Sequence, residues 1–132
     1  MRTAKTLPLP LAAGAFVLAS VQPGGPAWAG QASVLDATAV ANSNGSYTIS
    51  ATIAHADTGW KHYADKFEVL APDGTVLGTR VLYHPHVDEQ PFTRSLGNLQ
   101  VPVGVTTVIV RAADNVHKAG KRTFTLKLAP RK

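Results

Sequence analysis

The sequence predicts an all-β fold made of two packed sheets. Three observations favour this fold class. Apolar and polar residues alternate with period two in several segments, turn-forming residues separate these segments, and no stretch after residue 29 keeps a helical period for three turns. Period-two alternation is typical of strands with one buried face. A chain of 132 residues is long enough for one such domain.

The first 29 residues are predicted to be a secretory signal peptide (1–29). The start MRTAK is basic, the run LPLPLAAGAFVLASV is apolar, and Ala27 and Ala29 occupy the small-residue positions of a cleavage site. The apolar run is too short, and too interrupted by proline, to be a good membrane span. We therefore expect a mature domain of residues 30–132, periplasmic or secreted, with no membrane span after cleavage.

Seven segments of the mature domain are expected to be strands. The clearest is YTISATIAH (47–55), in which alternate residues from Tyr47 to Ile53 share one apolar face. The pair Asp73-Gly74 indicates a hairpin between two further strands. The seven expected strands cover residues 33–40, 47–55, 66–70, 75–83, 92–96, 106–113 and 122–129. Short antiparallel strands in this number predict an immunoglobulin-like β-sandwich.

The composition excludes several classes of site. There is no cysteine, so we expect no disulfide, no thiolate catalysis, no Cys-based zinc site and no lipoprotein anchor. The one methionine is Met1, which excludes a methionine-rich copper(I) site. The net charge is +5, and loss of Arg2 and Lys5 with the signal peptide leaves 11 basic and 8 acidic residues, a net +3. We expect no nucleic-acid partner for an exported chain of this modest charge.

The five histidines are expected to gather at one end of the sandwich. If successive strands alternate in direction, the connections fall alternately at its two ends. The connections 41–46, 71–74 and 97–104 share one end and contain no histidine. The connections at the other end (55–65, 84–91 and 114–121) contain His55, His62, His84, His86 and His117, together with Asp57, Asp65, Asp88, Glu89 and Asp114.

Such a gathering predicts a metal site. Neutral imidazole binds zinc, copper and iron, and sets of three or four histidines with or without a carboxylate are known coordination shells. We expect His55, His62, His86 and His117 as ligands, with His84 as the alternate to His86. The nearby acids, Asp114 among them, would ligate or orient the imidazoles. The competing interpretation is that the histidines are ordinary loop residues, and that Trp60 is a plug over the open end of the core rather than a stacking platform.

Two resemblances add to this interpretation. Small, uncharacterised bacterial exported proteins contain segments that look like HADTGWKHYADKFEVLAPDGTVLGTRVL and HPHVDEQPFTRSL of this chain. This resemblance implies no particular activity. More distantly, residues 47–120 resemble the iron domain of superoxide reductases, the desulfoferrodoxin-like sandwiches. That resemblance implies an immunoglobulin-like fold and ligands at His55, at His62 before Tyr63, and at His117. Asp114 stands where that family has its thiolate ligand, so superoxide reduction gains little support.

Two functions follow as hypotheses. The first is an exported metal-binding protein with a redox or metal-handling role, whose cofactor is copper, zinc or iron. The alternative is a non-enzymatic interaction module that binds an exported protein or a small ligand through the same end loops. Its anchors would be aromatic: Trp60, Tyr63, Tyr83 and Phe92. A hydrolase ranks third, because Ser95 lacks the sequence context of a nucleophile elbow. The sequence leaves catalysis open.

Overall fold

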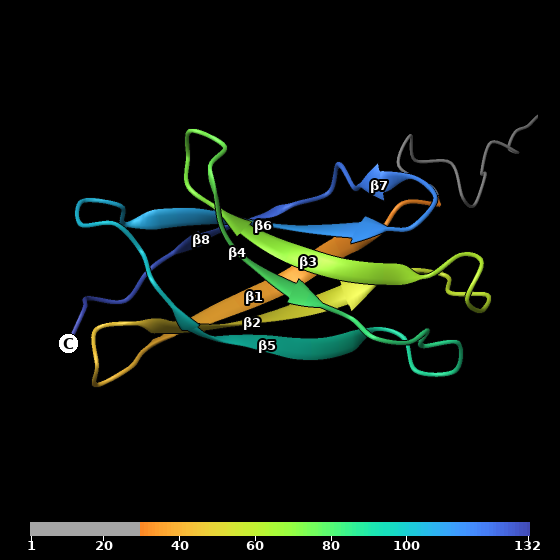
Figure 1. Cartoon of the computed structure of the whole chain (residues 1–132), viewed down its shortest axis with the longest axis horizontal. Helices are drawn as coiled ribbons and strands as arrows, with labels where there is room; N and C mark the ends of the chain where they lie inside the picture. Colours follow the sequence, from red (N-terminus) through yellow and green to blue (C-terminus); the bar gives the residue numbers. More distant parts are fainter. Residues whose placement is uncertain (1–29) are drawn as a thin grey trace, which may run out of the picture.

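The computed structural model describes residues 30–132, which form two antiparallel β-sheets packed face to face (Figure 1). The expected signal peptide, residues 1–29, lies outside the described residues. No helix in the described part of the chain is long and apolar enough to cross a membrane. The strands are β1 (Ser33–Ala41), β2 (Tyr47–Ala54), β3 (Ala64–Leu70), β4 (Val76–Val81), β5 (Phe92–Leu99), β6 (Thr107–Asp114), β7 (Lys118–Ala119) and β8 (Phe124–Lys127).

The smaller sheet has the strand order β1-β2-β5, and the larger has β4-β3-β6 with both β7 and β8 paired to β6. Every pairing is antiparallel. Two strand pairings lie beside the connections that carry the histidines. Ile53, two residues before His55, pairs with Phe92, and Ala64 at the start of β3 pairs with Asp114 at the end of β6. The first register places the end of β2 beside the start of β5, and the second places the start of β3 beside the end of β6.

The predicted all-β class and the two-sheet sandwich are confirmed. Each expected segment contains a strand, although the ends shift by a few residues: the strand expected over 75–83 stops at Val81, and the one expected over 92–96 runs on to Leu99. Strand β7 was not expected, because two residues are too few to display alternation. The finer immunoglobulin-like assignment stays a prediction.

The core forms where the apolar faces of the two sheets meet. Ile49 and Ile53 of β2 are completely buried, as are Phe67 and Val69 of β3 and Val110 of β6. Each such side chain stabilises the fold by roughly 1.5–3 kcal/mol relative to an exposed one. The expected hairpin is present: Gly74 has φ +94°, a conformation that glycine adopts readily. The Thr75 carbonyl accepts from the Ala71 N–H across the turn.

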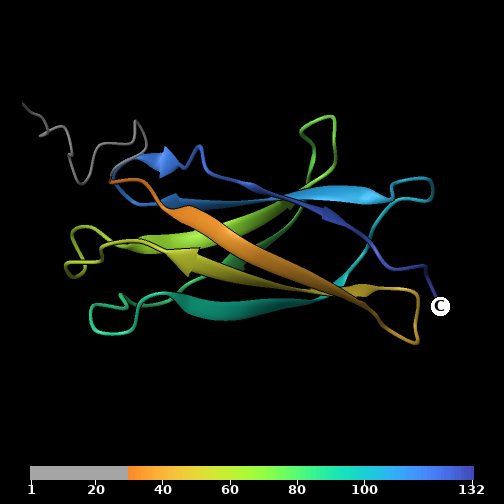
Figure 2. The same ribbon diagram turned by 180° about the vertical axis from the view of Figure 1, so that it is seen from behind.

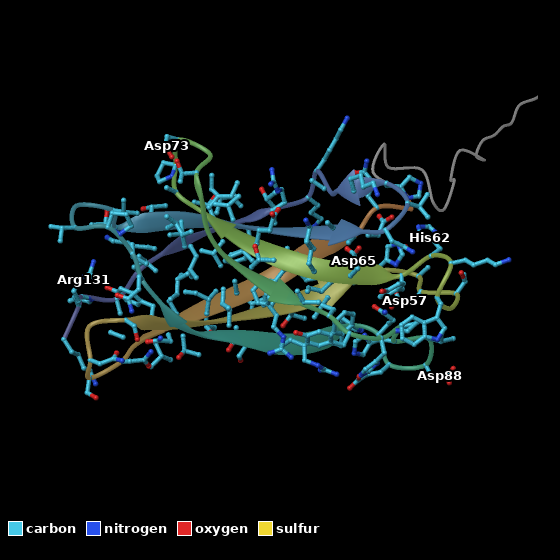
Figure 3. All side chains as sticks on the ribbon, in the orientation of Figure 1. Asp57, His62, Asp65, Asp73, Asp88 and Arg131 are labelled. Carbon is cyan, nitrogen blue, oxygen red and sulfur yellow. The ribbon has the colours of Figure 1, made fainter. Side chains whose placement is uncertain are left out.

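The connections divide between two ends of the sandwich, as predicted. The β2–β3, β4–β5 and β6–β7 connections lie at one end, beside the start of the described chain, while the β1–β2 and β5–β6 loops lie at the opposite end (Figures 1 and 2). We call the first the histidine end, because all five histidines belong to its connections. Figure 3 shows Asp57, His62 and Asp88 there and Arg131 at the other end.

The interpretation of Trp60 as a plug over the core is wrong. Its side chain is 65% exposed and makes an edge-on contact with Tyr63, with ring centroids 5.6 Å apart. Leu82 and Phe92 are buried near this end instead, together with the polar residues His55 and Asp57. At the histidine end the core is therefore covered by buried residues of the connections, some of them polar, whereas Trp60 faces solvent.

Candidate metal centre

A tight turn in the β2–β3 connection brings His62 back toward the end of β2. The His62 carbonyl accepts from the Thr58 N–H at 3.0 Å, and the Gly59 carbonyl accepts from the His62 N–H at 3.1 Å. Gly59 has φ +141°, which a side chain would disfavour. His55 follows β2 directly and so lies beside the returning His62.

A second turn, after β6, is built around the Asp114 carboxylate. Its Oδ1 accepts hydrogen bonds from the backbone N–H groups of Val116 (2.9 Å) and His117 (2.6 Å). Asn115 links this turn to the β2–β3 connection, since its Oδ1 accepts from the Tyr63 N–H and its amide donates to the Trp60 carbonyl. The positions of His62 and His117 are thus coupled by hydrogen bonds from the Asn115 side chain to the backbone of the β2–β3 connection.

Three imidazoles and one carboxylate meet at the centre of the histidine end. We call His55, His62, His117 and Asp114 the His55 group. His62 Nε2 lies 3.2 Å from His55 Nε2, 3.2 Å from His117 Nδ1 and 3.3 Å from Asp114 Oδ1. Asp114 Oδ1 is 3.2 Å from His117 Nδ1, and Asp114 Oδ2 is 3.7 Å from His55 Nε2. The ligand atoms of His55, His62 and Asp114 all lie within 4.8 Å of one another.

Hydrogen bonds alone do not satisfy this arrangement. A neutral imidazole nitrogen offers either one N–H or one lone pair in the ring plane, so His62 Nε2 can make one good bond to its three close neighbours. Asp114 Oδ2 is buried and has no hydrogen-bond partner. An unsatisfied buried carboxylate oxygen is costly. A positive charge at the centre of the group would satisfy these atoms.

The distances suit a transition-metal ion. His62 Nε2, His117 Nδ1 and Asp114 Oδ1 form a nearly equilateral triangle with edges of 3.2 and 3.3 Å. A point equidistant from all three in their plane is about 1.9 Å from each. An ion at bond lengths of about 2.0–2.1 Å would sit slightly out of this plane. His55 Nε2, 3.2 Å from His62 Nε2, would be the fourth ligand atom.

Asp57 orients His55 rather than joining the ligands. Its Oδ1 lies 2.5 Å from His55 Nδ1 and accepts from the Ala64 N–H at 3.0 Å, while its Oδ2 accepts from the His86 N–H at 2.7 Å. The side chain is completely buried. A carboxylate that holds the Nδ1 proton leaves the Nε2 lone pair directed at the centre, as in many metal sites.

The charge state of Asp114 also suits a ligand. Burial by itself would raise the pKa of its carboxyl. The N–H donors of His117 and Val116 and the charges of His55 and His117 outweigh burial and hold this pKa below its ordinary value of 3.8. Asp114 is accordingly ionised near neutral pH and contributes a negative charge to the group.

One side of the His55 group is open to solvent. The side chains of His55 and Asp114 are 1% and 0% exposed, whereas those of His62 and His117 are 26% and 38% exposed. A bound ion would thus contact the buried side chains of His55 and Asp114 and would be reachable from solvent on the side of His62 and His117.

The structure does not bring His84 and His86 into this group, contrary to the expected ligand set. The His86 ring stacks on Phe92 at 3.9 Å, and its Nε2 lies 2.9 Å from Arg94 Nη2. The His84 ring lies 4.7 Å from that of His86, and its Nδ1 is 3.1 Å from the Pro85 carbonyl. The physical reason is that Asp57 binds the backbone N–H of His86 while Phe92 offers its face to the ring. We call His84 and His86 the His86 pair.

The remaining acids at this end do not contact the imidazoles of the His55 group. Asp88 is exposed, and Glu89 forms an ion pair with Arg94 at 3.3 Å. Asp65 is half-buried, with one oxygen lacking a hydrogen-bond partner, and burial raises the pKa of its carboxyl.

Sequence reasoning missed two residues that shape the site. The Gln90 side chain accepts from the His55 N–H and donates to the His86 carbonyl, which joins the two sets of histidines. Gly30 places its carbonyl oxygen 3.1 Å from His55 Nε2. Neither has a pattern in the sequence that marks it as part of a site, although Gly30 is the residue after the expected cleavage position.

Comparison with known proteins gives one relative of limited coverage. The chain is 39% identical over 96 residues to a protein of Halomicrobium mukohataei described as a "Putative lipoprotein". The match covers 73% of this chain and 47% of the relative, so the chain spans about half the length of the curated relative it matches. No family model matches the sequence. No solved structure matches it either.

Proposed function

We propose that this chain is an exported metal-binding protein whose centre is the His55 group. The observation that carries this proposal is the crowding of His62 Nε2 by two ring nitrogens and a carboxylate oxygen within 3.3 Å. A cation shared by these atoms would relieve their mutual repulsion.

The donor set selects the class of metal. Three imidazoles and a carboxylate, without sulfur, favour borderline divalent ions such as copper(II), zinc and iron(II) over soft copper(I). The open side near His62 and His117 suits capture and release of the ion or access of a small reactant to it.

Two observations support export. The N-terminal segment has the order of basic, apolar and small residues found in secretory signals. The relative in Halomicrobium mukohataei carries a name that describes a lipoprotein, a class of exported protein. The site would then operate in the periplasm or outside the cell.

Metal titration tests the proposal. Residues 30–132, which contain strands β1 to β8, would be freed of metal and titrated with copper(II) and zinc while thermal unfolding is followed. An ion at a hundredfold excess over its Kd stabilises the native state by about 2.7 kcal/mol, which raises the Tm of a domain of this size by about 10 °C or more. The variant His62→Gln should lose this shift.

The matched control is His84→Gln, which removes an exposed histidine outside the His55 group. It should retain the full shift in Tm. If wild-type protein shows no stabilisation at micromolar copper(II) or zinc, or if both variants respond as wild type does, the His55 group is not a metal site.

A second candidate function is recognition of an exported partner, favoured by the exposed apolar side chains at the histidine end. Trp60, Tyr83 and Val87 are 65%, 74% and 53% exposed. Aromatic residues in this setting are common anchors of interfaces. The two functions separate cleanly: replacing His62 and His117 together by Gln should abolish metal binding and spare partner binding, whereas Trp60→Ala with Tyr83→Ala should do the reverse.

A further inference from the structure

Gly30, at the start of the described chain, lies against the His55 group. Its carbonyl oxygen is 3.1 Å from His55 Nε2. A Cβ placed on Gly30 would lie 3.1 Å from Cε1 and 3.4 Å from Nε2 of the His117 ring. The backbone of this one residue therefore approaches two of the three imidazoles of the group.

Contacts of the following residues hold Gly30 in this place. Ala32 is fully buried, and the Gln31 side-chain oxygen accepts from the Lys121 N–H at 3.1 Å. Gly120 approaches so closely that a Cβ there would lie 1.9 Å from the Ala32 carbonyl oxygen. The Val34 N–H donates to the Arg122 carbonyl. The segment before β1 is thus packed against the chain between β6 and β8.

In the neutral tautomer whose Nδ1–H donates to Asp57, the contact between Gly30 and His55 joins two electron-pair donors, because His55 Nε2 then presents a lone pair to the Gly30 carbonyl oxygen. Facing lone pairs at 3.1 Å repel unless a proton or a cation lies between them. The distance between the Gly30 oxygen and His55 Nε2 is therefore that of two neighbouring ligand atoms on one ion.

We propose that cleavage between Ala29 and Gly30 completes the metal centre, with the new α-amino nitrogen and the carbonyl oxygen of Gly30 as additional ligands. This inference rests on the proposed function and on the expected cleavage site. Water adds across the Ala29–Gly30 peptide bond, giving a carboxylate on Ala29 and an ammonium on Gly30. The ammonium releases one proton to solvent when its nitrogen binds the ion, and nitrogen, Cα, carbonyl carbon, oxygen and metal close a five-membered ring.

The uncleaved chain lacks this ligand. Its Gly30 nitrogen is part of a peptide bond, where resonance delocalises the lone pair and leaves a poor metal ligand. The presence of glycine at position 30 also fits a backbone that approaches the ion. Gly30 has φ +88°, and a side chain there would press on the His117 ring, so glycine permits the close approach of the backbone. The centre would therefore reach full affinity after export and processing.

Two chains with different starts test the inference. One begins at Gly30 with a free amine, released from a fusion that leaves no extra residue, and the other begins at Ala27 and so carries Gly30 as an internal residue. Copper(II) affinity is measured for both by competition with a chelator. Because a ligand on the same chain acts at high effective concentration, the Gly30 start should bind at least about tenfold more tightly. Each start is repeated with His62→Gln, which should remove the difference if the amine and His62 share one ion.

A direct readout accompanies the affinities. Protein that begins at Gly30 and is labelled with ¹⁵N-glycine should show a strongly coupled ¹⁵N in electron–nuclear double resonance of bound copper(II), and the Ala27 start should show none. Equal affinities with only imidazole nitrogens coupled would overturn the role of the amine and leave the proposed function standing. Absence of copper(II) and zinc binding by both chains would overturn the role of the amine together with the proposed function.

Discussion

The His55 group and the His86 pair share one end of the sandwich but have opposite surroundings. In the His55 group, ring nitrogens of three imidazoles point at one another and at a buried carboxylate. In the His86 pair, the buried ring lies flat on Phe92 and its Nε2 faces the Arg94 guanidinium. The first arrangement could hold a cation, whereas the positive charge of Arg94 disfavours one at the second.

One residue, Asp57, separates these two environments. It holds the ring of His55 with one carboxylate oxygen and the backbone of His86 with the other. His55 is thereby aimed at the centre, and His86 is held by its main chain with its ring left to Phe92. A shared location therefore does not make histidines ligands, because the partners of the second ring nitrogen and of the backbone N–H decide where each ring points.

Removing the Asp57 charge should have the largest effect, because both sets of histidines depend on it. In Asp57→Asn, the three hydrogen-bond donors His55 Nδ1, Ala64 N and His86 N lose their carboxylate acceptor. The new amide nitrogen is itself a donor, so at least one of these three donors is left without an acceptor. We expect a loss of about 3 kcal/mol in the free energy of unfolding, measured with urea. Asp88→Asn, an exposed change in the neighbouring loop, should stay within about 0.5 kcal/mol. A loss under 1 kcal/mol for Asp57→Asn would contradict this role.

Gly120→Ala should disturb both the fold and the His55 group. The added Cβ would lie 1.9 Å from the Ala32 carbonyl oxygen, so the segment that carries Gly30 must move. Overpacking of this kind costs about 1–3 kcal/mol. Copper(II) affinity should fall together with stability. The matched control is Gly97→Ala, whose Cβ meets nothing nearer than Thr48 Oγ1 at 3.9 Å. Equal behaviour of the two variants would show that the close approach of Gly120 is unimportant.

The His86 pair should respond to pH in metal-free protein. Burial, then the charges of Arg94 and His84, lower the pKa of His86 below its ordinary 6.5. The unfolded chain therefore binds this proton more readily, and the stabilising contribution of neutral His86, fully present above pH 6.5, is lost as pH falls through the folded pKa. Unfolding free energies measured between pH 8 and 5 should decline more steeply for wild type than for His86→Gln. Parallel curves would mean that His86 titrates alike in both states.

His84→Gln should have the smallest effect of these changes. The residue is exposed and contacts the Pro85 carbonyl and the His86 ring. We expect unfolding free energy within about 0.5 kcal/mol of wild type and an unchanged Kd for copper(II). A tenfold weaker Kd, measured by chelator competition, would place His84 in the metal site and erase the distinction between the two sets of histidines.

Much of the fold was predictable because it depends on local patterns. The alternation in β2 fixes which residues of that strand enter the core, and Asp73-Gly74 fixes a hairpin. Simple alternation of strand direction then assigns all five histidines to one end. These inferences use properties of neighbouring residues, which a single sequence displays.

The members of the site were only partly predictable, because ring directions in short connections depend on distant partners. His55, His62, His117 and Asp114 were expected and do meet, whereas His86 was expected and does not. Its direction depends on Asp57 and Phe92, which are 29 and 6 residues away in sequence. Gly30 could not be recognised because its contact with His55 spans 25 residues and uses only the backbone of Gly30. Trp60 was misjudged because size alone does not determine burial.

Anomalous diffraction from zinc-soaked crystals of residues 30–132 would show whether the His55 group shares one ion. We expect one strong zinc peak within about 2.3 Å of His62 Nε2, His117 Nδ1 and an Asp114 oxygen, with His55 Nε2 beside it. A peak between His84 and His86, or no ordered peak at millimolar zinc, would contradict it.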